Sequence, residues 1–264
     1  MRRMAGFDEA TAVRRRGDGA YDVAMDPDWF VAGPNGGYVA SVLLRALVTE
    51  VGAPGRPPRS LPVHYAQAAV EGPAAVLTEV VRTGKSMSFL TARLVQAGRV
   101  VANAMATFGR GRSDLEFQDF RPDTLPPGQV EPLVSDISPP IAQRYEYRPI
   151  GVRQPFSGVD SEFECWLRLR EPRPIDEVVL ATHVDAMFPP VLFRATKPVI
   201  APTVDLTVHF RRPPSVEGFD GWCLGRARSR TAAEGFVEED CEIYDESGVL
   251  LAHSRQLAVL VPLG

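Results

Sequence analysis

The chain has 264 residues, a formal net charge of −4 at pH 7, 45% hydrophobic residues and 23% charged residues. This composition is typical of a globular protein and excludes a disordered chain, while the acidic balance argues against nucleic acid as a bulk partner. Three cysteines without CxxC spacing predict free thiols in a reducing cytoplasm, and the lack of an apolar run of about 18 residues predicts that no segment spans a membrane.

The first predicted helix follows the glycine-rich stretch Gly33-Pro-Asn-Gly-Gly. Apolar residues then recur with helical spacing, and the glycines allow another group to approach the backbone closely. Residues 1–27 are predicted to be a polar leader, rich in Arg but without the apolar run of a signal peptide. Four strand-like runs separated by turn sequences come after the helix, at about residues 61–70, 74–83, 87–97 and 99–110. Residues 28–112 are therefore predicted to form a first unit.

A proline-rich connector is predicted over residues 113–158, because eight prolines fall between Arg121 and Pro155. A second unit over residues 159–264 repeats the order of elements. Its predicted elements are a strand at 163–169, a helix at about 175–187, and strands at about 203–211, 221–230, 233–244 and 248–262. Each half is therefore a helix followed by a long antiparallel meander, which predicts the α+β class.

The two halves also repeat in sequence. Leu-Pro-Val-His-Tyr from Leu61 matches Leu-Thr-Val-His-Phe from Leu206, and each is followed by Val-Glu-Gly. The offset between equivalent residues grows from 145 at His64 and His209 to 150 near the end of each half. A long period seen only twice indicates one supersecondary unit duplicated within the chain rather than a solenoid.

Two segments carry a resemblance to a known family. The run Gly-Pro-Asn-Gly-Gly-Tyr-Val-Ala-Ser-Val-Leu-Leu-Arg-Ala from Gly33, and the run Ala-Pro-Thr-Val-Asp-Leu-Thr-Val-His-Phe-Arg-Arg-Pro from Ala201, resemble the acyl-CoA thioesterase II family. The resemblance covers roughly residues 28–262 and is vague in the connector. It implies a double hotdog fold, in which each half wraps a curved antiparallel sheet around its helix. It also implies hydrolysis of acyl-CoA thioesters, with no metal and no redox cofactor.

Family members hold a water with an Asp, a Thr or Ser, and a Gln, and the resemblance places these roles on Asp185, Thr203 and Gln256. A buried carboxylate is costly without partners, and Thr and Gln are uncharged partners that can hold a carboxylate and a water together. By the repeat offset, Asp185 and Gln256 correspond to Ala40 and Ala106 in the first half. The asymmetry predicts one retained site and one lost site.

Substrate contacts are predicted at two further places. Gly36 and Gly37 are expected to offer backbone N–H groups that stabilise the oxyanion of the reaction. Arg82 and Lys85 flank a hairpin turn and are candidates for the phosphates of coenzyme A, although a solvated turn is the simpler interpretation. Asp205 is a same-face neighbour of Thr203 in a regular strand and therefore a decoy for the site.

Other functions stay open on the sequence. A hotdog hydratase or dehydratase acting on acyl thioesters would need His183, and a non-catalytic acyl-CoA or lipid-binding protein would need no site at all. No GxSxG elbow, P-loop or zinc spacing is present in the sequence. The favoured hypothesis is a cytoplasmic thioesterase of lipid metabolism, with exposed sheet edges available for homo-oligomer formation. The acyl chain, and the choice between coenzyme A and acyl carrier protein as its carrier, are not determined.

Overall fold

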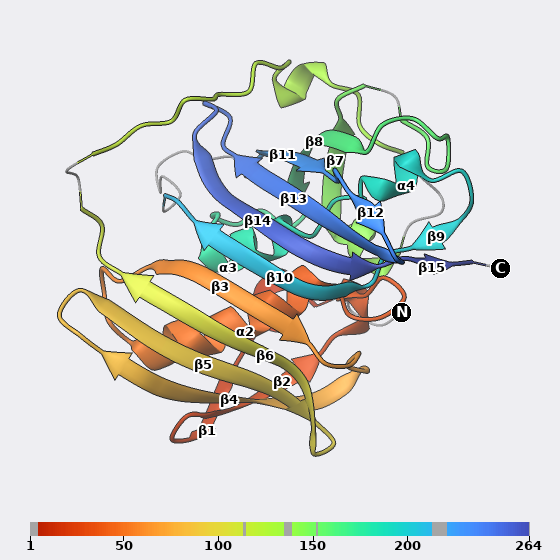
Figure 1. Ribbon diagram of the computed structural model, residues 1–264. Helices are drawn as coiled ribbons and strands as arrows, with labels where there is room; N and C mark the ends of the chain where they lie inside the picture. The colour runs from red at the N-terminus through yellow and green to blue at the C-terminus, as the bar shows by residue number, and fades with distance from the viewer. Residues whose placement is uncertain (1–4, 113–114, 135–138, 152, 213–220, 264) are drawn as a thin grey trace.

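The computed structural model describes residues 5–112, 115–134, 139–151, 153–212 and 221–263 (Figure 1). The elements of the first half are α1 (Phe7–Ala10), β1 (Arg14–Gly17), β2 (Ala20–Met25), η1 (Pro27–Trp29), α2 (Gly36–Val51), β3 (Pro58–Tyr65), β4 (Gly72–Thr83), β5 (Met87–Gln96) and β6 (Arg99–Gly109). Those of the second half are η2 (Pro127–Gln129), η3 (Pro140–Arg144), β7 (Tyr145–Pro149), β8 (Glu162–Leu169), α3 (Glu177–His183), α4 (Val191–Arg194), β9 (Val199–Ile200), β10 (Thr203–Phe210), β11 (Cys223–Arg228), β12 (Ala232–Ala233), β13 (Phe236–Tyr244), β14 (Leu250–Val259) and β15 (Val261–Pro262).

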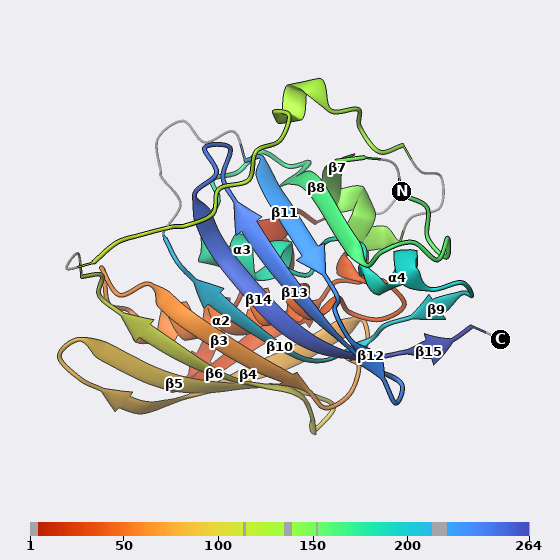
Figure 2. The same ribbon diagram turned by 45° about the horizontal axis from the view of Figure 1, so that its top comes forward.

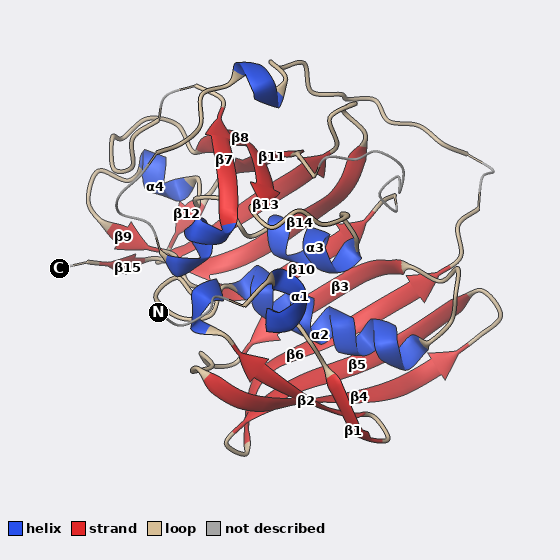
Figure 3. Ribbon diagram, turned by 180° about the vertical axis from the view of Figure 1, so that it is seen from behind, coloured by secondary structure: helices blue, strands red, loops and turns tan. Residues whose placement is uncertain are grey.

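The two halves share one large antiparallel sheet. Its strand order is β1-β2-β4-β5-β6-β3-β10-β14-β13-β11-β8-β7, with β12 paired to β13. The halves join along β3 and β10, which run side by side through the middle of the molecule (Figures 1 and 2). Helices α2 and α3 lie next to each other on one face of this sheet (Figure 3). This arrangement is the predicted double hotdog.

A pseudo-twofold axis relates the halves. Pro62 of β3 faces Thr207 of β10, and these two residues are equivalent positions of the sequence repeat. On either side of the axis, Leu61 faces Val208 and Val63 faces Leu206. Leu61 therefore meets Val208 just as its counterpart Leu206 meets Val63, the counterpart of Val208.

Most strand predictions agree with the structure within a few residues, but the strand predicted at 61–70 is β3 (Pro58–Tyr65), and three further regions differ. Residues 14–25, assigned to a polar leader, contain β1 and β2, and β2 pairs with β4 because its alternate residues are buried. The connector contributes β7, which forms the other edge of the sheet against β8. The second helix is shorter than predicted and ends at His183, and Pro189 and Pro190 lie shortly beyond it.

Helix α2 is fixed at both ends. The side chain of Asn35 accepts a hydrogen bond from the N–H of Tyr38, and Gly52 ends the helix in the left-handed conformation at φ 52°. The hydroxyl of Ser41 donates to the carbonyl oxygen of Val178 in α3 at 2.7 Å. These contacts set the position of the α2 N-terminus against the second half. Across the described residues, no helix is both long and apolar enough to cross a membrane.

Candidate active site

Asp185 lies in the turn after α3, and its side chain is directed at the N-terminus of α2. Its Oδ2 atom accepts hydrogen bonds from the backbone N–H of Gly37 at 2.8 Å and from Nδ2 of Asn35 at 2.9 Å. The same Nδ2 donates to the backbone carbonyl of Asp185 at 2.7 Å. A helix N-terminus carries a partial positive charge and N–H groups without intrahelical partners, so it stabilises the ionised carboxylate.

The two glycines at this helix end are required by the close packing. A Cβ atom on Gly37 would lie 2.9 Å from the carbonyl oxygens of Ala181 and Thr182, and one on Gly36 would lie 3.0 Å from Oδ2 of Asp185. The group that approaches these glycines is therefore the second half of the protein itself. A contact of Gly36 or Gly37 with the substrate stays a prediction.

Thr203 and Gln256 meet across β10 and β14. The Thr203 hydroxyl donates to Oε1 of Gln256 at 2.9 Å. The strand register shifts between Thr203 and Asp205, which marks a β-bulge. The bulge turns Thr203 to the helix-covered face, where Gln256 is buried, and leaves Asp205 on the other face beside the exposed His64. Asp205 is therefore not a same-face neighbour of Thr203, as a regular strand would have made it.

The carboxylate of Asp185 has an unusual protonation equilibrium. Burial raises the pKa of Asp185 from 3.8 to about 6, and hydrogen bonds from Gly37, Gln256, Gly36 and Asn35 oppose this rise. A carboxylate with a pKa of about 6 is still mostly ionised at pH 7, yet it is more basic than an ordinary aspartate. These are the properties of a general base that acts near neutral pH.

Two family models match the chain. The acyl-CoA thioesterase N-terminal domain matches residues 25–109, and the acyl-CoA thioesterase C-terminal domain matches residues 117–260. The chain belongs to the acyl-CoA thioesterase family. The match of both models within one chain agrees with the two halves seen in the fold.

Solved structures that are similar to this chain show the same architecture over almost their whole length. A hotdog-fold protein of unknown function from Alicyclobacillus acidocaldarius is 30% identical with a TM-score of 0.90, and 98% of each chain is covered. A candidate thioesterase II from Thermobifida fusca is 26% identical with a TM-score of 0.84, and 99% of each chain is covered.

By sequence, the chain is also similar to an uncharacterized protein of Mycobacterium tuberculosis. The two are 24% identical, with 91% of this chain and 90% of that protein covered.

Three further residues at the candidate site were not predicted from the sequence. Asn35 was visible in the glycine-rich motif, but its contact with Asp185 crosses between the halves. The hydroxyl of Tyr65 donates to the carbonyl of Gly36 at 2.7 Å, and its repeat counterpart is Phe210, which lacks this group. Glu239 is 7% exposed and faces Gln256 across β13 and β14.

The signal for Glu239 was present in the strand pattern. Val237, Glu239, Cys241 and Ile243 alternate along β13, and all four are buried on the helix-covered face. Burial, followed by the charge of Asp185, raises the pKa of Glu239 well above its usual value. The alternation alone would have placed a carboxyl group in the interior.

The predicted phosphate-binding cations lie away from these residues. Arg56, which comes just before β3, donates to the carbonyl of Lys85 at 2.9 Å, so the hairpin with Arg82 and Lys85 sits at the start of β3. Tyr65, which touches Gly36, lies at the other end of that strand. The eight residues of β3 span about 23 Å at 3.3 Å per residue. The structure does not bring Arg82 and Lys85 to Asp185.

His183 is buried, and its ring packs against the edge of Tyr145 at a centroid distance of 5.4 Å. Its Nδ1 lies 3.4 Å from the Tyr145 hydroxyl, and burial lowers the pKa of His183 to about 3. The histidine is therefore neutral at physiological pH. Its surroundings do not favour the proton-transfer role that a hydratase would require.

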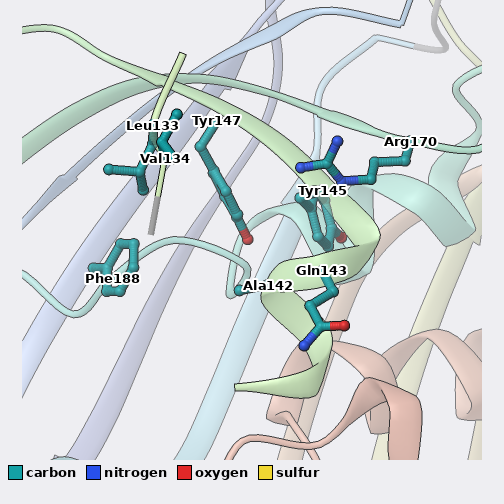
Figure 4. Close-up of a pocket in the computed structure, with 8 residues that line it drawn as sticks. All are labelled: Leu133, Val134, Ala142, Gln143, Tyr145, Tyr147, Arg170 and Phe188. Carbon is teal, nitrogen blue, oxygen red and sulfur yellow. The ribbon is translucent and has the colours of Figure 1, made fainter. Parts of the chain in front are cut away.

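A cavity of about 230 Å³ lies beside the turn that carries Asp185 (Figure 4). Phe188 forms one wall of it, and Tyr147, which forms another, donates a hydrogen bond from its hydroxyl to the carbonyl of Ala186 at 2.7 Å. The complete lining is Leu133, Val134, Ala142, Gln143, Tyr145, Tyr147, Arg170 and Phe188. Among the described residues, no cluster of His, Cys, Asp and Glu side chains has the geometry to hold a metal ion.

Proposed function

We propose that this protein hydrolyses acyl-CoA thioesters with one water molecule held by Asp185, Thr203 and Gln256. The observation that carries the proposal is the joint environment of Asp185 and Gln256. Burial raises the pKa of Asp185 to about 6 against the opposing effect of the Gln256 amide, and the oxygen of that amide accepts a hydrogen bond from the Thr203 hydroxyl. Membership of the acyl-CoA thioesterase family supports the substrate class.

In the proposed reaction, Asp185 accepts a proton from the water as the water oxygen attacks the thioester carbonyl carbon. The C–S bond of the tetrahedral intermediate then breaks, and the thiol leaves with the proton that Asp185 had accepted. A thiolate is a good leaving group, because thiols of this kind have a pKa of about 8.5. Little acid assistance is needed, so the main requirement is activation of the water.

The N-terminus of α2 has a second role in this proposal. While Asp185 is ionised, the Gly37 N–H donates to its carboxylate. A protonated carboxyl accepts hydrogen bonds less strongly, so that interaction weakens when the water has lost its proton. Negative charge is then moving to the carbonyl oxygen of the substrate, which the partial positive charge of the helix end stabilises.

A release assay tests the proposed function. Purified protein is incubated with a panel of acyl-CoAs of different chain lengths, and free thiol is measured. We expect catalytic release from at least one acyl-CoA, and its loss in Asp185→Asn. Binding of acyl-CoA without thiol release would favour a binding protein, and release only from acyl-carrier-protein thioesters would assign a different carrier.

A further inference from the structure

Glu239 and Gln256 form a buried polar pair on the helix-covered face of the sheet. They are direct cross-strand neighbours on β13 and β14. Glu239 is 7% exposed and Gln256 is 5% exposed, so neither carboxyl nor amide has free access to water. A buried carboxyl group without a cation needs a hydrogen-bond partner or a proton.

The amide of Gln256 interacts with three polar side chains. Its oxygen accepts from the hydroxyl of Thr203 at 2.9 Å. The two hydrogens of its nitrogen are then available to acceptors, and the interaction with Gln256 lowers the pKa of both Asp185 and Glu239. The orientation of the amide therefore depends on the two carboxyl groups together.

Ionisation of two buried carboxyl groups beside one amide is disfavoured, because their negative charges repel. Asp185 has the N-terminus of α2 and the Asn35 amide to stabilise its charge. The charges that raise the pKa of Glu239 are those of Asp185 across the site and of Glu238 and Asp240 on its own strand. The structure therefore favours ionised Asp185 beside neutral Glu239.

The first half of the chain provides an internal comparison. Cross-strand pairing makes Leu90 and Ala106 the counterparts of Glu239 and Gln256, since Leu90 faces Ala106 as Glu239 faces Gln256. Both first-half residues are fully buried and apolar. The polar pair is thus absent as a unit from the half that also lacks a counterpart of Asp185.

We propose that Glu239 is a positioning residue that works as a protonated acid and fixes the Gln256 amide toward Asp185 and the water. The inference rests on the proposed hydrolysis. Neutral Glu239 accepts one N–H of Gln256 through its carbonyl oxygen, which leaves the other N–H aimed at Asp185. Ionisation of Glu239 would put a second negative charge beside the base and weaken this arrangement.

Two substitutions separate this role from the alternatives. Glu239→Gln resembles the protonated acid in shape and hydrogen bonding, so we expect a kcat close to that of the unmodified protein at pH 7. Its rate should also persist at alkaline pH, where the unmodified enzyme loses activity as Glu239 ionises. Glu239→Leu copies the first half and frees the amide, so kcat should fall by about 10²-fold with little change in KM.

Glu242→Leu is the matched control, because Glu242 lies on the same strand but faces away from the helices. It should leave turnover unchanged. A loss in Glu239→Gln as large as that in Asp185→Asn would make Glu239 an ionised base and overturn the inference. An unchanged kcat in Glu239→Leu, or the same alkaline loss in Glu239→Gln, would also overturn it.

One measurement does not require hydrolysis, so it tests the protonation of Glu239 independently of the proposed function. Infrared difference spectra between neutral and alkaline pH should show a protonated carboxyl band in the unmodified protein and none in Glu239→Gln. If no thioester is hydrolysed, the proposed function fails while this band still reports the protonation of Glu239. If hydrolysis is found but the band is absent, the inference fails and the proposed function stands.

Discussion

Oδ2 of Asp185 accepts a hydrogen bond of 2.8 Å from the backbone N–H of Gly37, a residue 148 positions earlier in the chain. The carboxylate comes from the second half and the helix N-terminus from the first. The candidate active site is therefore not contained in the half that carries its side chains. Both copies of the duplicated unit contribute to it, one through side chains and the other mainly through backbone groups.

Asp185→Asn is expected to keep the shape of the site and remove the base. The rate of thiol release should fall by about 10²-fold or more, which is the scale of general-base contributions. Asp205→Asn is the matched control, because Asp205 lies nearby on the outer face of β10. Rates measured with both variants decide the assignment. An equal loss in both, or no loss in Asp185→Asn, would remove Asp185 from the mechanism.

The activity should depend on pH through the same carboxyl group. Since the pKa of Asp185 is about 6 and the ionised form is the base, kcat should fall as the pH drops through about 6. Stability should change in the opposite direction. The native protein binds this proton more tightly than the unfolded chain, so the contribution of Asp185 to stability decreases as pH rises from 3.8 to about 6. Asp185→Asn should therefore raise Tm at pH 7, and thermal unfolding at pH 4 and pH 7 checks this.

Thr203→Val removes the hydroxyl that holds Gln256 while conserving side-chain volume. We expect kcat to fall with little change in KM, because the residue is proposed to position the water rather than bind substrate. Gln256→Ala should behave in the same way. Combining either substitution with Asp185→Asn should cost much less than the product of the separate losses. Losses that multiply fully would show that these residues act independently.

Gly37→Ala is expected to disturb the site through packing alone. The new Cβ atom would lie 2.9 Å from two backbone carbonyl oxygens of the second half and from Cβ of Asp185. The helices must separate, so both Tm and kcat should fall. Gly128→Ala is the control, since a Cβ atom there meets nothing within 4 Å. A normal Tm and kcat in Gly37→Ala would show that the close contact is not needed.

A non-hydrolysable acyl-CoA analogue should bind productively once per chain. The positions equivalent to Thr203 and Gln256 are Pro58 and Ala106, which offer neither a hydroxyl nor an amide. Titration calorimetry gives the number of sites directly. Two equivalent sites per chain would contradict the loss of the first site.

The sequence was sufficient for the strands of both meanders, because their alternation and turn residues are local signals. It was not sufficient for β1 and β2, whose short alternating segment lies within an Arg-rich stretch that reads as a leader. The edge strand β7 was hidden by prolines in the same way. Its place in the sheet depends on pairing with β8, which is tertiary information.

The candidate site was likewise predictable only in part from local sequence signals. The resemblance assigns the proposed roles to Asp185, Thr203 and Gln256, but nothing in the sequence pairs Asp185 with Asn35 and Gly37 of the other half. The correspondence between helices α2 and α3 also differs from the one that the repeat offset gives. Alignment of the two helix caps, Asn35 and Asp176, places Leu44 rather than Ala40 opposite Asp185. The repeat offset cannot reveal this, because the loops between helix and sheet differ in length.

The contact between α2 and the Asp185 turn subjects the two halves to different constraints. In the second half, the proposed chemistry depends on the identity of three side chains, so a single substitution there should abolish it. In the first half, the contribution at Gly36 and Gly37 is made largely by amide groups that every non-proline residue possesses, so what a substitution can damage there is space. The first half is consequently still required for the proposed site, and mutations at Gly36 or Gly37 should appear as defects of fit rather than of chemistry.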